Sequence, residues 1–448
     1  MRYKLTAAAA ACAAAAIALS GCGSSGTSGS SSSSNVPTTL TVWRMGPSAA
    51  SEVTWMNGVE AQFRKEFPAY KNTKINVVWI PWANASTDFS NALTSGKSAP
   101  DITEIGNTET PTEAELGALA DLTSDVKSWS SGSDLVPGMV ANDTQNGKIF
   151  GVPWFGGVRG VWYRKDKFKA AGITSTPTTW AQLVSDAQKL QKKFPGTYGI
   201  GAPTNYTDGI VSFIWGAGGQ VATQGSDGKW TAQLTSPASE AGIKFYVSLY
   251  KQDHLSPQKY VGQTELGNPG ATSGGANEDF ALGKLDLYVD GPWAQSEFPK
   301  NAVDSKNWAS FPIPSENGPN PAPAFAGGSD LAVWSTSKYQ TADWDLLQVM
   351  DSESNATTFA NLQQFFPPFT SKLTGGAYSG SPLMSGFAKA GSATQISPLN
   401  AKNWSTSDEN DLVIPTMIKS LMQGANFQAT VSKANTELTN VLNTGQES

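Results

Sequence analysis

Residues 39–80 read TLTVWRMGPSAASEVTWMNGVEAQFRKEFPAYKNTKINVVWI. Residues 39–43 and 75–80 are rich in β-branched and aromatic side chains, which predicts two strands. Between them, apolar residues recur at helical spacing and a proline then ends the helix: Trp55, Met56, Val59, Phe63, Phe67 and Pro68. A strand, a helix and a second strand in this order predict a parallel sheet covered by helices.

The same alternation continues toward the C-terminus. Further strands are predicted at 100–106, 285–289 and 331–334. Further helices are predicted from Trp180, around 243–250, after the strand that ends at 334, and twice near the C-terminus, around 413–421 and 431–441. The fold class is therefore α/β. About 410 residues follow the N-terminal segment, which is too many for one domain built around a single sheet. Two lobes are therefore expected.

The N-terminal segment has the pattern of a secretory signal. Arg2 and Lys4 precede an apolar, alanine-rich run from 5 to 19, which is short for a membrane span. The run ends in LSGC at 19–22, which resembles the bacterial lipobox. We therefore expect residues 1–21 to be a lipoprotein signal peptide and Cys22 to receive the lipid. The alternative is an ordinary cleaved signal with a chance cysteine.

Residues 22–35 are almost entirely Ser and Gly after the cysteine, which predicts a flexible tether. Cys12 and Cys22 are the two cysteines of the chain, and Cys12 would leave with the signal peptide. No disulfide is then expected. The predicted location is the extracellular face of the cell membrane, with the lipid as the one attachment to it.

Composition argues against several classes of protein. Charged residues make up 15% of the chain, against about 25% in an average globular protein, and no basic block occurs. Nucleic-acid binding is therefore not expected. The one histidine, His254, ends a predicted helix, where a cation is a common structural choice. A Ser-His-Asp triad, a histidine metal site and a cofactor are not expected.

Five groups of residues together resemble a known family. They are 40–67; SAPDI at 98–102 with GNT at 106–108 and GALADL at 117–122; NGKIFGVP at 146–153 with WYRKD at 162–166 and PTTW at 177–180; FALGK at 280–284 with GPW at 291–293; and PIP at 312–314 with GGSDLAV at 327–333. In this order behind a lipobox, they resemble the family 1 extracellular solute-binding proteins of ABC sugar importers, which are maltose-binding-protein-like.

The resemblance implies a two-lobed, periplasmic-binding-protein-like fold of class II with a ligand cleft between the lobes. The N-terminal lobe is expected at 36–152 plus 332–366, and the C-terminal lobe at 153–331 plus 367–448. Crossings between lobes are expected near 152–158, 327–331 and 365–369. These segments contain Gly or Pro, as hinges often do, although ordinary turns use the same residues.

The resemblance implies that the protein captures a carbohydrate, a di- or oligosaccharide, when its lobes close. It would act as a monomer and deliver the sugar to the transmembrane subunits of an ABC permease. One alternative is a secreted enzyme that acts on glycans with two carboxyl groups. Its candidates are Glu109, Glu265, Asp290 and Asp330. Another is a binding protein for a non-sugar ligand such as glycerol phosphate or a peptide, but a phosphate would favour an Arg/Lys cluster that the sequence lacks.

Aromatic residues are the first candidates for the sugar site, because the C–H faces of a sugar pack on flat rings. Trp293 follows a predicted strand through Gly291 and Pro292, so it lies at a strand's carboxyl end, where open α/β sheets bind ligands. The family resemblance implies a stacking tryptophan at this position. The other aromatic candidates are Trp82, Tyr206, Trp215 and Trp404.

Polar candidates are expected to bond the hydroxyls of the sugar. Asn107, Thr108 and Glu109 follow the strand predicted at 100–106, and the resemblance places cleft residues at that turn. The remaining candidates are charged residues or a glycine next to strands and crossings: Arg44, Arg159, Gly328 and Asp330. The alternative role for Arg44 and Asp330 is a surface salt bridge, and for Arg159 a strut at the hinge.

Overall fold

The computed structural model describes residues 36–46, 48–95, 98–268, 271, 273–303, 305–373, 381–391, 394–395 and 401–445. The predicted signal peptide, Cys22 and the Ser/Gly tether lie outside these residues. Within the described ranges, no helix combines the length and apolar character that a membrane span requires.

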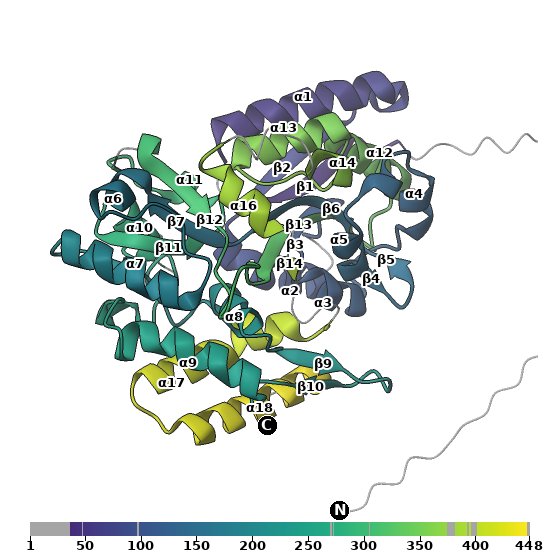
Figure 1. Ribbon diagram of the computed structural model, residues 1–448. Coiled ribbons are helices and arrows are strands. Elements are labelled where there is room, and N and C mark those ends of the chain that lie inside the picture. Colours follow the sequence, from purple (N-terminus) through teal and green to yellow (C-terminus); the bar gives the residue numbers. More distant parts are fainter. Residues whose placement is uncertain are drawn as a thin grey trace, which may run out of the picture. The chain divides into compact units, whose positions relative to one another are not determined.

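The first of two main sheets contains the predicted β-α-β unit (Figure 1). Strands β1 (Thr39–Met45) and β2 (Lys74–Ile80) pair in parallel along their whole length, and helix α1 (Ala50–Glu66) connects them. The sheet order is β14-β13-β3-β1-β2, with β6 also paired to β13. The other strands are β3 (Ile102–Gly106), β6 (Val152–Val158), β13 (Ala324–Val333) and β14 (Thr394–Gln395). The prediction of a β-α-β opening and a parallel sheet core is confirmed.

Helix α1 buries the face that the sequence pattern predicts. Trp55, Met56, Val59 and Phe63 lie in one core cluster with α12 (Gln340–Met350) and α13 (Glu353–Gln363). Figure 1 shows α1 and α13 side by side over this sheet. Burial of large apolar side chains at about 25 cal/mol per Å² is the main stabilising contribution here.

The second main sheet has the order β12-β7-β11-β8. Its strands are β7 (Gly160–Arg164), β8 (Tyr198–Ile200), β11 (Leu285–Asp290) and β12 (Trp308–Phe311). Helices pack on it and on one another around a large apolar cluster: α7 (Trp180–Lys193), α8 (Thr207–Gly216), α9 (Pro237–Lys251), α17 (Val413–Met422) and α18 (Phe427–Thr444). The strand predicted at 285–289 and the two predicted C-terminal helices are confirmed, so the chain is α/β as expected.

The remaining α-helices and strands of the described residues are mostly shorter. The helices are α2 (Ala85–Ser95), α3 (Thr110–Glu115), α4 (Thr123–Ser128), α5 (Pro137–Asn142), α6 (Lys165–Ala170), α10 (Ala276–Ala281), α11 (Ala294–Glu297), α14 (Thr370–Leu373) and α16 (Met384–Ala390). Two hairpins are formed by β4 (Thr144–Gln145) with β5 (Lys148–Ile149), and by β9 (Ala222–Gln224) with β10 (Trp230–Ala232).

The three predicted crossing segments lie next to one another. Strand β6 belongs to the first sheet and β7 to the second, and Arg159 is the residue between them. Gly157 of β6 is paired with Gly327 of β13, and Gly156 bridges to Phe366. Because β6 and β13 pair within the first sheet, the predicted boundaries at 152/153 and 331/332 fall inside its strands. The division into lobes at these positions stays a prediction.

Candidate functional site

A cavity of about 210 Å³ lies where the turn after β3 meets the start of α8. Its lining comes from five separate parts of the chain and is almost entirely polar: Thr108, Arg159, Asn205, Tyr206, Thr207, Asp208, Glu265 and Asp408. Helix α8 follows β8, so the cavity is at the carboxyl ends of β3 and β8, the edge where open α/β sheets bind ligands. In the part of the chain that the structure describes, no group of three acidic, His or Cys side chains is placed to hold a metal ion.

Arg159 connects the crossing between the sheets to this cavity. Its Nε donates to the Tyr206 hydroxyl at 3.1 Å and its Nη2 donates to Asp208 at 2.6 Å. The guanidinium also lies over the rings of Tyr206, Trp293 and Phe325, 5.0–5.5 Å from each ring centre. Such cation–π contacts and a buried ion pair hold the side chain in one orientation.

Two carboxyl groups of the second sheet region have different surroundings. Asp290, at the end of β11, is buried and accepts from the Tyr206 hydroxyl at 3.3 Å, from the Gly291 amide at 2.7 Å and from the Tyr288 hydroxyl. Glu265 lines the cavity. Burial, followed by the charge of Asp290, raises the pKa of Glu265 to about 8. Glu265 is therefore mostly protonated at neutral pH when the cavity holds no ligand.

Trp293 lies directly beside the cavity wall. Its ring stacks on Phe365 with centres 5.4 Å apart and an interplanar angle of 24°, and Arg159 lies over it. A side chain at Gly157 or at Gly291 would collide with the indole, so both glycines are required for its position. The half-buried ring thus connects a segment of the second sheet region with two of the crossing segments.

The turn after β3 holds the three polar candidates, and the structure places them differently. Thr108 lines the cavity. Asn107 is buried. Its backbone N–H donates to the Gly328 carbonyl at 3.0 Å, and its side-chain Nδ2 donates to the Ala326 carbonyl at 3.3 Å. Asn107 therefore ties the turn to β13. Glu109 is also buried and lies against Gly106.

Trp82 lies close to the same turn. A Cβ at Gly106 would lie 3.2 Å from the Glu109 carboxyl and 3.7 Å from the Trp82 ring, so the three residues are neighbours. Trp82 is 48% exposed, which leaves much of its indole free to contact solvent. The cavity lining includes neither Trp82 nor Glu109.

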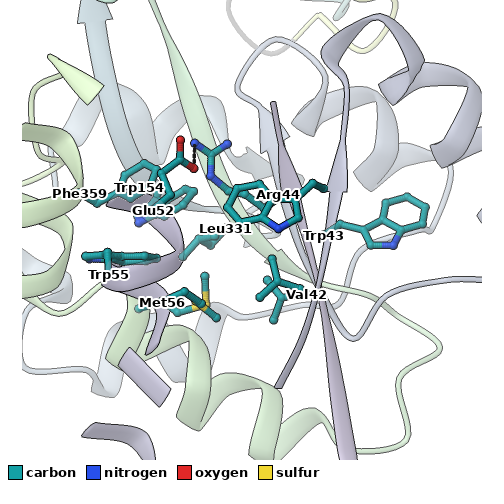
Figure 2. Close-up of a pocket in the computed structure, with 12 residues that line it drawn as sticks. Val42, Trp43, Arg44, Glu52, Trp55, Met56, Trp154, Leu331 and Phe359 are labelled. Carbon is teal, nitrogen blue, oxygen red and sulfur yellow. Dashed lines mark ion pairs between the residues drawn. The ribbon is translucent and has the colours of Figure 1, made fainter. Parts of the chain in front are cut away.

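Arg44 lies in the interior of the first sheet region, away from the 210 Å³ cavity. It pairs with Glu52 of α1 at 3.0 Å and with Glu104 of β3. Figure 2 shows Arg44 and Glu52 pointing toward each other among apolar and aromatic side chains. The void beside them is only about 10 Å³, which is enough for one water molecule at most. The buried ion pairs explain Arg44 without a ligand.

Asp330 is also interior. It is fully buried, accepts a hydrogen bond of 2.6 Å from Thr110 Oγ1 and faces the buried carboxyl of Asp143. Burial raises the pKa of Asp330 to about 6. Burial, followed by the charge of Asp330, raises the pKa of Asp143 well above its usual value. The two carboxyl groups face each other in the interior of the first sheet region, and neither lines the cavity.

The remaining candidates are packed in the structure. Trp215 and Trp404 are each 3% exposed and belong to the large apolar cluster of the second sheet region. Gly328 lies so close to the Phe155 carbonyl that a side chain there would overlap it. The structure thus brings Thr108, Arg159 and Tyr206 together at the cavity with Trp293 beside them.

Five lining residues were not among the predicted binding residues, and one of them, Glu265, was a candidate only for the enzyme alternative. Asn205, Thr207 and Asp208 stand in the polar run TNYTD at 204–208, which follows β8. A polar run at the carboxyl end of a strand was the available signal, but β8 is only three residues long and its pattern is weak. Asp408 lies in the similar polar run at 403–411.

Comparison with known proteins identifies the family. Residues 49–357 match the model of the bacterial extracellular solute-binding proteins, which is more than half of the chain. This chain belongs to that family. Among curated solute-binding relatives, the diacetylchitobiose binding protein DasA of Streptomyces coelicolor is 27% identical over 390 residues, 86% of this chain and 85% of DasA. The mannitol-binding protein of Pseudomonas aeruginosa is 28% identical over 168 residues, 36% of each chain.

Solved structures of solute-binding proteins share the fold. The sugar-binding protein MalE from Xanthomonas citri superposes with a TM-score of 0.74 at 23% identity, covering 90% of this chain and 97% of that one. Maltose-bound MalE3 of T. maritima gives 0.73 at 20% identity, covering 89% and 98%. The expectation of a two-lobed, maltose-binding-protein-like α/β fold is confirmed.

Proposed function

We propose that this solute-binding protein captures a carbohydrate, a di- or oligosaccharide, by closure of its lobes and delivers it to the transmembrane subunits of an ABC permease. The two main sheets would belong to the two lobes, with boundaries near 152/153, 331/332 and 366/367. The protein would act as a monomer, held at the extracellular face of the cell membrane by a lipid on Cys22.

The observation that supports a sugar ligand is the unsatisfied polar lining of the cavity. Thr207 Oγ1 and Asp208 Oδ1 meet no hydrogen-bond partner within the described residues. Buried polar atoms are nearly always satisfied, by protein, by ordered water or by a bound molecule. Asn205, Thr108 and Tyr206 add amide and hydroxyl groups, which donate and accept as sugar hydroxyls do.

Trp293 supplies the second feature that a sugar requires. Its half-buried ring lies beside Arg159 at the edge of the cavity and could cover the C–H face of one ring. A phosphate ligand is disfavoured because the one guanidinium of the lining already pairs with Asp208 and the lining holds two further acidic groups. The names of the relatives, which include binders of diacetylchitobiose and mannitol, agree with a sugar ligand.

Binding without catalysis fits the positions of the carboxyl groups that a glycosidase would need. Of the four nominated residues, Glu265 lines the cavity, whereas Glu109, Asp290 and Asp330 do not. Asp290 is occupied by two tyrosine hydroxyls and a backbone amide. A glycosidase requires two carboxyl groups on either side of the scissile bond.

Calorimetric titration of the protein with a panel of α- and β-linked mono-, di- and oligosaccharides tests this function. We expect saturable binding of at least one sugar. Trp293→Ala should weaken that binding by about 30-fold, or about 2 kcal/mol, since a stacked aromatic anchor is lost. Trp230→Ala is the matched control, because Trp230 lies on the β9–β10 hairpin away from the cavity.

Two results would count against the proposal. If no sugar of the panel binds, the carbohydrate function is wrong. If sugars bind but Trp293→Ala has no more effect than Trp230→Ala, the function stands and the stacking role of Trp293 is wrong.

A further inference from the structure

Glu265 is held in a defined position on the cavity wall. Its backbone carbonyl accepts from the Asn277 amide at 3.1 Å, and the next residue, Leu266, accepts from the Gly275 amide at 3.1 Å. Thr264 and Gly267 close the turn with a backbone bond of 2.7 Å. The carboxyl group is therefore presented by an anchored turn and not by a free surface loop.

The carboxyl of Glu265 lacks a partner that its neighbours have. Asp208 pairs with Arg159 at 2.6 Å, and Asp290 accepts from Tyr206, Tyr288 and Gly291. Apart from the bond to its own backbone amide, the Glu265 carboxyl makes no hydrogen bond or ion pair with the part of the chain that the structure describes. This half-buried carboxyl group is therefore available to a polar or charged group of a bound molecule.

The charge around Glu265 indicates what kind of group would meet it. The cavity lining contains Asp208, Glu265 and Asp408 but a single basic residue, Arg159, whose charge Asp208 already balances. Asp290 is close enough to act on Glu265 and adds a further negative charge. The site is thus short of positive charge, so an added cation would be attracted and an added anion repelled.

We propose that Glu265 selects sugars that carry a free amino group, by pairing its carboxylate with the ligand's ammonium ion. The inference rests on the proposed function, because it names the class of sugar that the same cavity takes. Thr108, Asn205 and Thr207 would bond the neutral hydroxyls, and Glu265 would distinguish an amine from a hydroxyl or an acetamide at one position of the ring.

Ion pairing at Glu265 has a measurable consequence for protons. Burial and Asp290 hold the pKa of the empty-site carboxyl at about 8, so Glu265 is protonated near pH 6 and must lose its proton when an ammonium ion binds. The other titratable groups that act on Glu265, or on which it acts, come from every element around it: Arg159, Tyr206, Asp208, Tyr246, Tyr288, Asp290 and Glu297.

Three disaccharides that differ only at the 2-position test the proposal. The β-1,4-linked dimers of glucosamine, N-acetylglucosamine and glucose carry an ammonium, an acetamide and a hydroxyl group there. Each is titrated into the full chain by calorimetry near pH 6, in two buffers of different ionisation enthalpy, which reports the protons released. We expect the amine dimer to bind at least about tenfold more tightly than the other two and to release close to one proton per complex.

Glu265→Gln removes the charge with little change in shape. We expect it to abolish the tenfold preference and the proton release while the neutral dimers keep their affinity within about threefold. Glu316→Gln is the charge-matched control, since Glu316 is exposed and outside the lining. Equal melting temperatures of the variants would show that each one folds.

The outcomes separate the two proposals. If a neutral dimer binds as tightly as the amine dimer, or if Glu265→Gln leaves the preference intact, the role of Glu265 is wrong and the carbohydrate function stands. If neither these dimers nor any sugar of the wider panel binds, the carbohydrate function itself fails.

Discussion

Asp143 and Asp330 form a pair of buried carboxyl groups that should make stability depend on pH. Both carboxyl groups have raised pKa values, and that of Asp330 is about 6. The folded protein therefore keeps a proton on the pair at pH values above about 4, where the unfolded chain has lost it. The stability from this shared proton is full below about pH 4 and is lost as the pH rises through about 6. Asp143→Asn supplies an amide donor that needs no proton.

We therefore expect Asp143→Asn to become more stable relative to the parent protein as the pH rises from about 4 to 7, by about 1 kcal/mol per pH unit. Urea unfolding followed by tryptophan fluorescence at four pH values measures the difference. Asp227→Asn on the exposed β9–β10 hairpin is the control and should leave the slope unchanged. Parallel pH profiles for Asp143→Asn and the parent would show that the pair shares no proton.

Single residues show where sequence reasoning ends. Arg44 and Arg159 were both candidates for the site because the sequence places them at the end of a predicted strand and at a predicted crossing. Arg44 is directed into the first sheet region by Glu52 and Glu104, which are 8 and 60 positions away, whereas Arg159 is directed to the cavity by Asp208, 49 positions away. The sequence next to each arginine does not indicate which acidic residue will pair with it. The fold is therefore needed to tell which arginine reaches the cavity.

At the level of elements, α3 makes the contact that joins the turn after β3 to the C-terminal segment. Thr112 Oγ1 lies 3.1 Å from Ser405 Oγ and also donates to the Lys402 carbonyl, and Lys402 pairs with Glu115 at 3.1 Å. The ion pair is half exposed on both sides, and such pairs contribute at most about 1 kcal/mol. The two hydrogen bonds of Thr112 should therefore matter more for keeping α3 in place.

Thr112→Val removes the hydroxyl and keeps the shape, so both hydrogen bonds are lost. We expect dissociation of a bound sugar to become about five- to tenfold faster, which corresponds to about 1 kcal/mol. Lys402→Ala should change the rate by less than about threefold. Displacement of the sugar followed by stopped-flow tryptophan fluorescence gives both rates. A larger effect of Lys402→Ala would contradict this ranking.

Elements with a strong period were predicted well, and short ones were not. The 17 residues of α1 and the seven of β1 and of β2 show clear apolar spacing, and their bounds agree with the prediction within a few residues. The three-residue β8 and the turn that follows it have no period to detect. Residues 205–208, which join β8 to α8, supply four of the eight lining residues, and Tyr206 was the one predicted candidate among them.

For the whole molecule, the two-lobed class came from the family resemblance, because local patterns do not specify how two sheets are joined. The structure adds that the crossings meet at Gly156, Gly157, Gly327 and Phe366, which come from three segments far apart in the sequence. Arg159 and Trp293 contact each other, and Trp293 also packs against Gly157 and Phe365 at this junction. Ligand contact at the cavity is thereby connected with the segments about which closure would occur.

If closure admits and retains the sugar, a covalent bond across the contact of α3 should block both entry and exit. Thr112 and Ser405 have side-chain oxygens 3.1 Å apart, a spacing compatible with the short Cβ separation of a disulfide. We expect the oxidised Thr112→Cys, Ser405→Cys variant to bind sugar at least about 100-fold more slowly, and to keep sugar through dialysis when it is oxidised with the sugar present. Reduction should restore normal exchange, and Thr112→Cys alone should behave as the parent protein does. Rapid exchange by the oxidised double variant would show that binding does not require these two regions to separate.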